Sequence, residues 1–366
     1  MPDPRLYLDL ALPVVKTVQE CADHTITVVP FLQQYYDLPY NVVAHITDLH
    51  ALRDIYLHTN PLMTALAFAT FFVTPLVLLV SEVNRNYSQV DRLWSILPVI
   101  YNVHYAVWAH LNGLPTLQLN HVMAVSLIWG ARLTFNYWRK GGYQVGSEDY
   151  RWNIVKDYIG PAGMFILNVT FIALGQNILL WLITTPTYVL LLTARITGNT
   201  LSTYDTFFGR AMLGVVVMEY VADQAQWNYH KAKEAFAKTA KVPAGYTREQ
   251  IERGFNSTGI FAWSRHPNFA AEQSFWILLY QWSCLESNTI LNWTGAGALG
   301  YLILFQASTW LTELITAGKY PEYVIYQRRV GKFLPSILTK SMDVKFTPKE
   351  KQLVKDAQAG KGVKKL

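Results

Sequence analysis

The stretch PLMTALAFATFFVTPLVLLV, residues 61–80, decides the fold, because it runs for twenty residues without a charged side chain. A helix needs about 20 mostly apolar residues to cross the hydrocarbon core of a bilayer. Stretches of similar character follow at 93–112, 121–138, 161–182, 208–224, 269–285 and 295–316. Short polar loops separate them. The sequence therefore predicts an all-α, polytopic membrane protein with about seven transmembrane helices in one bundle.

The composition supports this fold class and argues against several others. Only 15% of the 366 residues are charged, against about 25% in soluble domains, and 51% are hydrophobic. An aromatic content of 14% argues against disorder. Two cysteines, Cys21 and Cys284, do not make a disulfide scaffold, and at this separation they are expected to be unpaired. The net charge of +6 lies in short loops and the C-terminal tail, which argues against nucleic-acid binding.

The bundle is expected to occupy residues 61–336. Residues 1–60 form a lumenal or interfacial segment before it, and residues 337–366 form a basic cytosolic tail after it. The fourth stretch is the least certain in length, because it extends in apolar character to residue 194. Within it, the sequence Thr-Thr-Pro at 184–186 could kink one long helix or divide it in two.

The distribution of positive charge predicts the orientation. The loops 81–92, 139–160 and 225–258, together with 317–366, hold 24 Lys and Arg residues, whereas the segments on the opposite side hold 4. Cytosolic loops of membrane proteins carry an excess of Lys and Arg. We therefore expect a lumenal or extracellular N-terminus and a cytosolic C-terminus, which also requires an odd number of spans.

Polar residues inside or beside the apolar stretches are candidate functional groups, because placing them in a membrane is costly. Gln89 and Asp91 precede the second stretch. Asp91 there either complements a helix dipole or, with Gln89, forms the hydrogen-bonding mouth of a pocket. Arg132 lies within the third stretch and needs an anionic or carbonyl partner, for which Asp91 is a candidate. The charged run 148–152 either pairs internally or holds a ligand.

A pair of carboxylates marks the end of the fifth stretch. Glu219 and Asp223 are four residues apart, so they share one face of a helix. Two such groups repel each other, and they are retained more readily if they accept hydrogen bonds from a ligand or an arginine. The apolar neighbours of Glu219 disfavour a plain solvated helix end.

The most specific motif is SRHPNF at residues 264–269, followed by Glu272. Its proline suits the first turn of a helix. Asn268 and Glu272 then lie one turn apart on one face, where an amide and a carboxylate can bind ribose hydroxyls or an amide. Arg265 and His266 beside an exposed helix start can hold phosphate.

This motif resembles the signature of the steroid 5-alpha-reductase-like membrane family, in the branch known only as a domain of unknown function. The sequences ADQ at 222–224 and KYPEY at 319–323 extend the resemblance, which covers about residues 60–336. The Arg-His-Pro-Asn block is shared with sterol delta-14 reductases and, more loosely, with isoprenylcysteine carboxyl methyltransferases.

The resemblance implies a seven-helix fold that binds NADPH from the cytosolic side, in the endoplasmic reticulum. Carried over by motif, Asp223, Asn268 and Glu272 become ligands of the dinucleotide, and Arg265 and His266 lie near its phosphates. Glu219 stands where some relatives have Asn, and Tyr320 would close over the cofactor. No metal site is implied.

The implied reaction is hydride transfer to a carbon–carbon double bond in a steroid, sterol or other lipid enone. Gln89 and Asp91 resemble the Gln-Glu pair of the family in place but not in identity, and Arg132 follows the position of the family's tyrosine by three residues. That position holds Trp129, which donates one hydrogen bond but delivers no proton as Tyr can. Other tyrosines could substitute, at 101, 105 or 137.

Two other functions remain open from the sequence. One is a membrane methyltransferase that uses S-adenosylmethionine, and the other is a non-catalytic lipid-binding relative. The expected partners are an apolar lipid or steroid substrate and membrane lipids. No nucleic acid and no obligate protein partner are expected.

Overall fold

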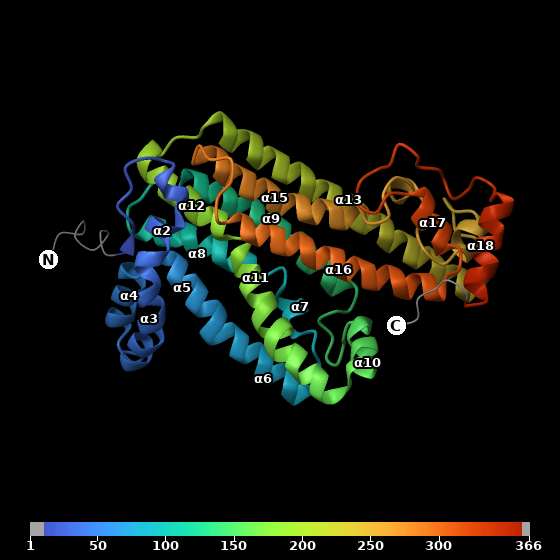
Figure 1. Ribbon diagram of the computed structural model, residues 1–366, viewed down its shortest axis with the longest axis horizontal. Coiled ribbons are helices and arrows are strands. Elements are labelled where there is room, and N and C mark those ends of the chain that lie inside the picture. Colours follow the sequence, from blue (N-terminus) through green and yellow to red (C-terminus); the bar gives the residue numbers. More distant parts are fainter. Residues whose placement is uncertain (1–10, 361–366) are drawn as a thin grey trace. The chain divides into compact units, whose positions relative to one another are not determined.

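The computed structural model of the protein describes residues 11–360 and is drawn in Figure 1. Its regular structure is helical, which confirms the predicted all-α class. Within the described range, extended backbone pairs only in an isolated parallel bridge between Ser264 and Gly331. The first ten residues of the predicted N-terminal segment and the last six of the predicted tail lie outside the described residues.

The α-helices run in the order α2 (His24–Thr27), α3 (Leu32–Ala44), α4 (Leu49–His58), α5 (Pro61–Ala67), α6 (Thr74–Asn84), α7 (Gln89–Leu93), α8 (Leu97–Leu111), α9 (Leu117–Arg139), α10 (Tyr150–Leu167), α11 (Gln176–Leu182), α12 (Thr185–Thr197), α13 (Thr203–Thr239), α14 (Arg248–Glu252), α15 (Pro267–Glu286), α16 (Gly295–Lys319), α17 (Tyr323–Arg329) and α18 (Pro348–Gln358). Two π-helical segments, η3 (Phe68–Val73) and η4 (Asn168–Gly175), join α5 to α6 and α10 to α11. Short 3-10 turns lie at Glu20–Ala22, Val29–Phe31 and Gly259–Ala262.

Three helical stretches in the described range are long and apolar enough to cross a membrane: Pro61–Asn84, Tyr150–Thr197 and Gly295–Lys319. They include three of the predicted spans, at 61–80, 161–182 and 295–316. The other four predicted stretches are also helical, as α8, α9, part of α13 and α15, but they fall short in length or apolar character. By length and composition, the described residues therefore contain three candidate membrane-spanning stretches, which suggests a membrane protein.

Local sequence explains where the long stretches begin and break. Asn60 accepts hydrogen bonds from the backbone N–H groups of the next turn, and Pro61 occupies its first position. In the 48-residue stretch, Gly160 has φ +69° and kinks α10 directly before Pro161. A second break follows α11, because α12 begins afresh at Thr185 with a proline in its first turn. Of the two readings of residues 184–186, the structure has the division into two helices.

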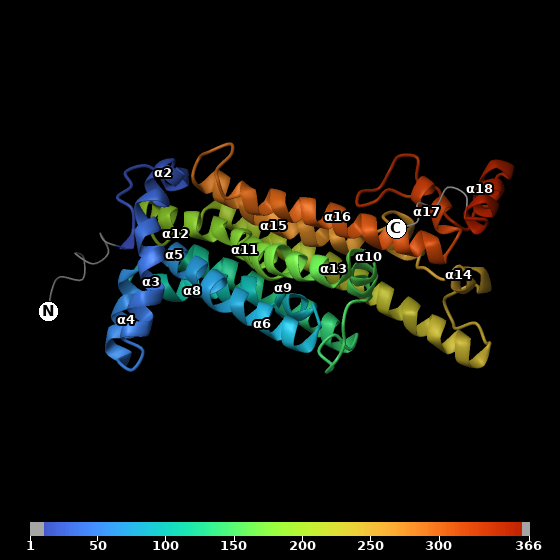
Figure 2. The same cartoon turned by 60° about the horizontal axis from the view of Figure 1, so that its bottom comes forward.

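The chain forms two compact units. The first unit contains residues up to Leu213 together with Trp276–Tyr301, and the second contains Gly214–Phe275 together with Leu302 onward. Helices α13, α15 and α16 each contribute one part to each unit. In the first unit, α3 and α4 lie side by side in Figures 1 and 2, and α8 and α9 pack together.

The core of the first unit is aromatic. Trp108, Trp129, Trp276 and Trp282 are almost completely buried in it. The rings of Trp129 and Trp276 meet edge to face with centroids 5.0 Å apart. Such pairs are favourable beyond the area that they bury. Trp129, at the position where the resemblance leads us to expect a tyrosine, is therefore a packing residue of this core.

The second unit has a core of its own below the C-terminal segment. Phe255, Tyr323, Tyr326 and Met342 are buried together, and α17 and α18 lie side by side in both views. Helix α18 begins with a capping box, in which Thr347 and Glu350 satisfy each other's backbone N–H groups. Much of the segment expected as a basic tail is thus packed helix and loop.

Candidate functional site

The first group of predicted residues lies in the first unit, around α7. The side chain of Gln89 donates to the carbonyl oxygen of Asn86 at 3.1 Å and accepts from Arg92 Nη1 at 2.8 Å. Asp91 accepts a hydrogen bond from Trp152 Nε1 at 3.3 Å. The two predicted residues therefore lie on one short helix, with Gln89 engaged by its own segment and Asp91 by α10.

Burial changes the chemistry of Asp91. It raises the pKa of this carboxyl group above its ordinary value, and this effect outweighs the hydrogen bond from Ser88 and the positive charge of Arg151, which lower it. Asp91 consequently keeps its proton to higher pH than a solvated aspartate does. A protonated carboxyl group can donate a hydrogen bond or a proton.

The charged run 148–152 holds α7 against the start of α10. Glu148 accepts from the backbone N–H of Tyr87 at 2.7 Å and pairs with Lys156 at 2.6 Å. Asp149 pairs with Arg151 at 2.9 Å. Of the two readings of this run, the structure has internal pairing. Arg132 lies half-buried on α9, one turn after Trp129.

The second group lies in the second unit, where α13 faces α15. Asn268 Nδ2 donates to Asp223 Oδ1 at 3.4 Å, which brings together two residues 45 positions apart. Glu219 lies one turn before Asp223, and Glu272 lies one turn after Asn268. All three carboxylates are buried. Buried carboxylates need hydrogen-bond donors or positive charge, and hydroxyl and amide groups of a ligand are suitable donors.

Arg265 and His266 both contact Glu313 of α16. Arg265 bonds Glu313 through Nε and Nη2, at 2.6 Å and 3.1 Å, and donates from Nη1 to the backbone carbonyl groups of Gln327 and Val330. His266 Nε2 lies 2.9 Å from Glu313 Oε1. Both side chains therefore hold a carboxylate of α16, and Arg265 also joins it to the last turn of α17 and to the residue that follows this helix.

The backbone of the motif is also held. Arg265 N–H donates to the carbonyl oxygen of Gly331 at 2.9 Å, and His266 N–H donates to that of Lys332 at 3.0 Å. The neighbouring Ser264 forms the parallel bridge with Gly331. These bonds fix the loop in front of α15 and so orient the helix turn that carries Asn268.

Tyr320 lies in a cationic setting directly after α16. Its hydroxyl group accepts from Lys233 Nζ at 2.8 Å, and the ammonium groups of Lys233 and Lys319 also lie over its ring. Burial raises the pKa of Tyr320, but the hydrogen bonds and positive charges of Lys233 and Lys319 lower it by more. The net pKa is therefore below the ordinary 10.0. Gly254, at φ +86°, makes room for the ring, because a Cβ there would overlap it.

Three buried charged residues of the second unit, Arg253, Glu313 and Arg329, were missed by the sequence analysis. Glu313 lies inside the predicted span 295–316, and that position was a signal for function or pairing. Arg253 is buried under the C-terminal segment, where it bonds Ser257, Asp343 and the backbone carbonyl of Met342. Nothing in its local sequence distinguishes it from other loop arginines.

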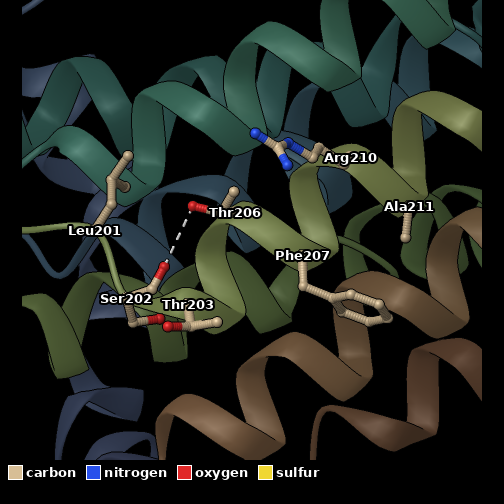
Figure 3. A pocket seen from close by; sticks show the side chains of 7 residues that line it. All are labelled: Leu201, Ser202, Thr203, Thr206, Phe207, Arg210 and Ala211. Atoms are coloured by element: carbon tan, nitrogen blue, oxygen red, sulfur yellow. Dashed lines mark hydrogen bonds between the residues drawn. The ribbon is translucent and has the colours of Figure 1, made fainter.

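A surface hollow of about 670 Å³ lies elsewhere, at the start of α13 in the first unit. Figure 3 shows its lining, in which the Phe207 ring points away from the Arg210 guanidinium group. Ser202 and Thr206 are joined by a hydrogen bond across its polar side. The hollow includes none of the predicted site residues. Across residues 11–360, no cluster of His, Cys, Asp and Glu suited to a metal ion is found.

Comparison with known proteins identifies the family. The chain is 34% identical over 337 residues to the uncharacterized protein C594.04c of Schizosaccharomyces pombe, with 91% of this chain and 95% of that protein covered. No solved structure matches the present chain. Residues 77–330, which include α7 and the SRHPNF motif, match the family described as a protein of unknown function, DUF1295. The chain therefore belongs to the DUF1295 family.

Proposed function

We propose that the protein is an NADPH-dependent reductase of a carbon–carbon double bond in a steroid, sterol or other lipid enone. The observation that carries the proposal is the contact of Asn268 with Asp223 between α13 and α15. Glu219 and Glu272 extend this contact to a group of buried acceptors beside an amide. These positions are the ones that the resemblance to steroid 5-alpha-reductase-like proteins assigns to the dinucleotide.

The donor and acceptor types fit one end of the cofactor. Ribose hydroxyl groups and the nicotinamide carboxamide are hydrogen-bond donors, and Asp223, Glu219 and Glu272 are acceptors, whereas Asn268 offers both kinds of group. The phosphates fit Arg265 and His266 less well, because Arg265 already pairs with Glu313 and His266 Nε2 already contacts the same carboxylate. Lys233 and Lys319 beside Tyr320 supply positive charge in the same unit.

NADPH held by Asp223, Asn268 and Glu272 would supply a hydride for the β-carbon of the enone, and the α-carbon would gain a proton from another group. A group near the carbonyl oxygen must stabilise the negative charge that develops there. Asp91 suits this role, since its raised pKa keeps a proton available and Trp152 orients one of its oxygens. Gln89 accepts a hydrogen bond from Arg92 and so holds that side chain in place. The resemblance adds Arg132 as a further cation of the catalytic group.

The proposal includes seven spans, adding α8, α9, the first part of α13 and α15 to the three stretches that are apolar enough by themselves. It places the C-terminus in the cytosol and the protein in the endoplasmic reticulum. These statements rest on the excess of Lys and Arg in the loops of one side and on the family resemblance.

Cofactor binding by the purified full chain tests the proposal. NADPH affinity is measured by calorimetry for the protein in lipid nanodiscs, and then for Asn268→Ala and Glu272→Gln. A hydrogen bond to a charged group contributes about 1.5–3 kcal/mol, so each variant is expected to weaken binding about tenfold or more. Glu252→Gln on α14 is the matched control, since its carboxylate is exposed and pairs only with Arg248.

The alternatives give different results in the same assay. Binding of S-adenosylmethionine without NADPH would indicate a methyltransferase. Binding of a sterol with neither cofactor would indicate a non-catalytic relative. Unchanged NADPH affinity in both site variants would show that the α13–α15 contact is not the cofactor site.

A further inference from the structure

The loop between α17 and α18 presents apolar side chains outward. Leu334, Ile337 and Leu338 are 76%, 102% and 75% exposed. The backbone turns tightly at the start of the loop, because a Cβ on Gly331 would overlap the carbonyl oxygen of Leu334. Three large exposed aliphatic side chains in so short a segment form an apolar patch, and such patches are typical of surfaces that contact a protein or a membrane.

Part of the loop's backbone is hydrogen-bonded within the loop. The hydroxyl group of Ser336 accepts from the N–H of Leu338 at 3.2 Å, and the N–H of Ser336 donates to the hydroxyl group of Thr339 at 3.1 Å. The N–H and the hydroxyl group of Thr339 both donate to the carbonyl oxygen of Ser336. Lys340 N–H donates to Arg329. Internal satisfaction of backbone groups is what a segment needs to enter a low-dielectric environment such as lipid.

The charges around the loop have one sign. The sequence from 323 to 342 contains no Asp or Glu, whereas it contains Arg328, Arg329, Lys332 and Lys340. Arg329 is neutralised by Glu350. The side chains of Arg328 and Lys340 are exposed, so the rim of the apolar loop is positive and suits an anionic surface.

The base of the loop lies along a helix that is apolar enough to cross a membrane. Lys332 Nζ donates to Gln306 Oε1 at 2.9 Å, and Gln306 is on the exposed face of α16. Gln306 precedes the end of α16 at Lys319 by about 20 Å of helix, at 1.5 Å per residue. Trp263, next to the bridge between Ser264 and Gly331, is 62% exposed. Tryptophan is enriched at membrane–water interfaces.

We propose that residues 333–338 insert into the bilayer leaflet beside the C-terminal half of α16, with Lys340 and Arg328 at the level of anionic lipid headgroups. The aliphatic side chains contact acyl chains, and Trp263 lies at the interface. The inference rests on α16 crossing the membrane and is independent of the reductase activity.

Fluorescence quenching in nanodiscs tests the insertion. A polarity-sensitive fluorophore is attached to Ile337→Cys in the full chain, and it is quenched either by spin labels on lipid acyl chains or by aqueous iodide. Lys241→Cys, in the exposed loop after α13, is the solvent control, and Ile303→Cys, 61% exposed on α16, is the lipid control. The native cysteines are free but buried, so the unsubstituted chain gives the labelling background.

We expect the label at 337 to behave like the label at 303, with lipid quenching several-fold above that at 241 and with little iodide quenching. Lys340→Glu should reduce the lipid quenching in anionic nanodiscs and leave it unchanged in neutral ones. Iodide quenching at 337 equal to that at 241 would overturn the proposal. Protection of the label at 337 from both quenchers would indicate a protein partner instead. Absence of lipid quenching at 303 would show that this face of α16 does not contact the membrane, which also overturns the proposal.

Discussion

Arg265 and Glu313 form a two-point ion pair with Nε–Oε1 2.6 Å and Nη2–Oε2 3.1 Å, and both side chains are more than nine-tenths buried. The pair joins the loop in front of α15 to α16. Bidentate pairs of this kind fix direction as well as distance. The arginine and histidine of the SRHPNF motif thereby become a brace for the helix turn that carries Asn268.

Removing the charge of Glu313 should destabilise the second unit. Glu313→Gln leaves the Arg265 guanidinium group buried without its counter-charge, which costs about 3–5 kcal/mol. The expected result is a lowered thermal midpoint in detergent. Glu234→Gln, which breaks the exposed pair of Lys231 and Glu234, should leave the midpoint unchanged. Equal midpoints for the two variants would show that the buried pair contributes little.

Tyr320 should ionise at lower pH than an ordinary tyrosine. The pKa lies below 10.0 because the lysines outweigh the effect of burial. Below the folded pKa the group is neutral in both states, so the added stability appears as pH rises through that pKa and is complete above about 10. Lys233→Met should shift the tyrosinate absorbance titration upward, measured against Tyr320→Phe. A titration that does not move would exclude Lys233 as the cause.

Glu350 should hold the C-terminal segment in place. Its carboxylate accepts from Arg329 at 2.8 Å, and hydrogen bonds from Arg329 and Thr347 lower its pKa to about 2. Glu350→Gln is expected to speed hydrogen exchange and proteolysis in residues 341–358. Asp356→Asn on the same helix is the control, and exchange rates that match this control would contradict the assignment.

The pH dependence of the same contact follows from the sign of the shift. Because the folded pKa of Glu350 is depressed, the stabilisation is present above the ordinary 4.5 and is lost as pH falls toward about 2. Exchange in residues 341–358 of the unsubstituted chain should therefore rise on acidification through that window. In Glu350→Gln it should be fast throughout.

Asp91 should affect turnover more than cofactor binding. Asp91→Asn removes the proton that the raised pKa retains, and general acid groups contribute about a hundredfold or more to rate. Once a lipid enone is found to be reduced, kcat should fall by that order while NADPH affinity stays the same. Turnover should also fall as pH rises through the raised pKa, since only the protonated form acts. Asp157→Asn on α10 is an exposed control, and a fully active Asp91→Asn would remove this residue from the mechanism.

The helical and apolar segments could be assigned from local sequence pattern alone. Residues 61–80 and 295–316 hold enough consecutive apolar side chains to specify spans without any tertiary information. The break near residue 184 was also visible locally, since the proline in the first turn of α12 cannot continue the preceding helix. Asn268 and Glu272 could also be placed on one helix face, because residues four apart in a helix lie one above the other.

The contacts between distant polar groups are visible only in the folded chain. Asp223 and Asn268 are 45 residues apart, and Arg265 and Glu313 are 48 apart. Local pattern carries no information about such pairs, so the contacts of Arg265 with Glu313 and of Asp91 with Trp152 could not be predicted from the sequence. The packing of the C-terminal segment was equally non-local, because it depends on Arg329, which pairs with Glu350 and donates to the backbone carbonyl groups of Ser341 and Val344.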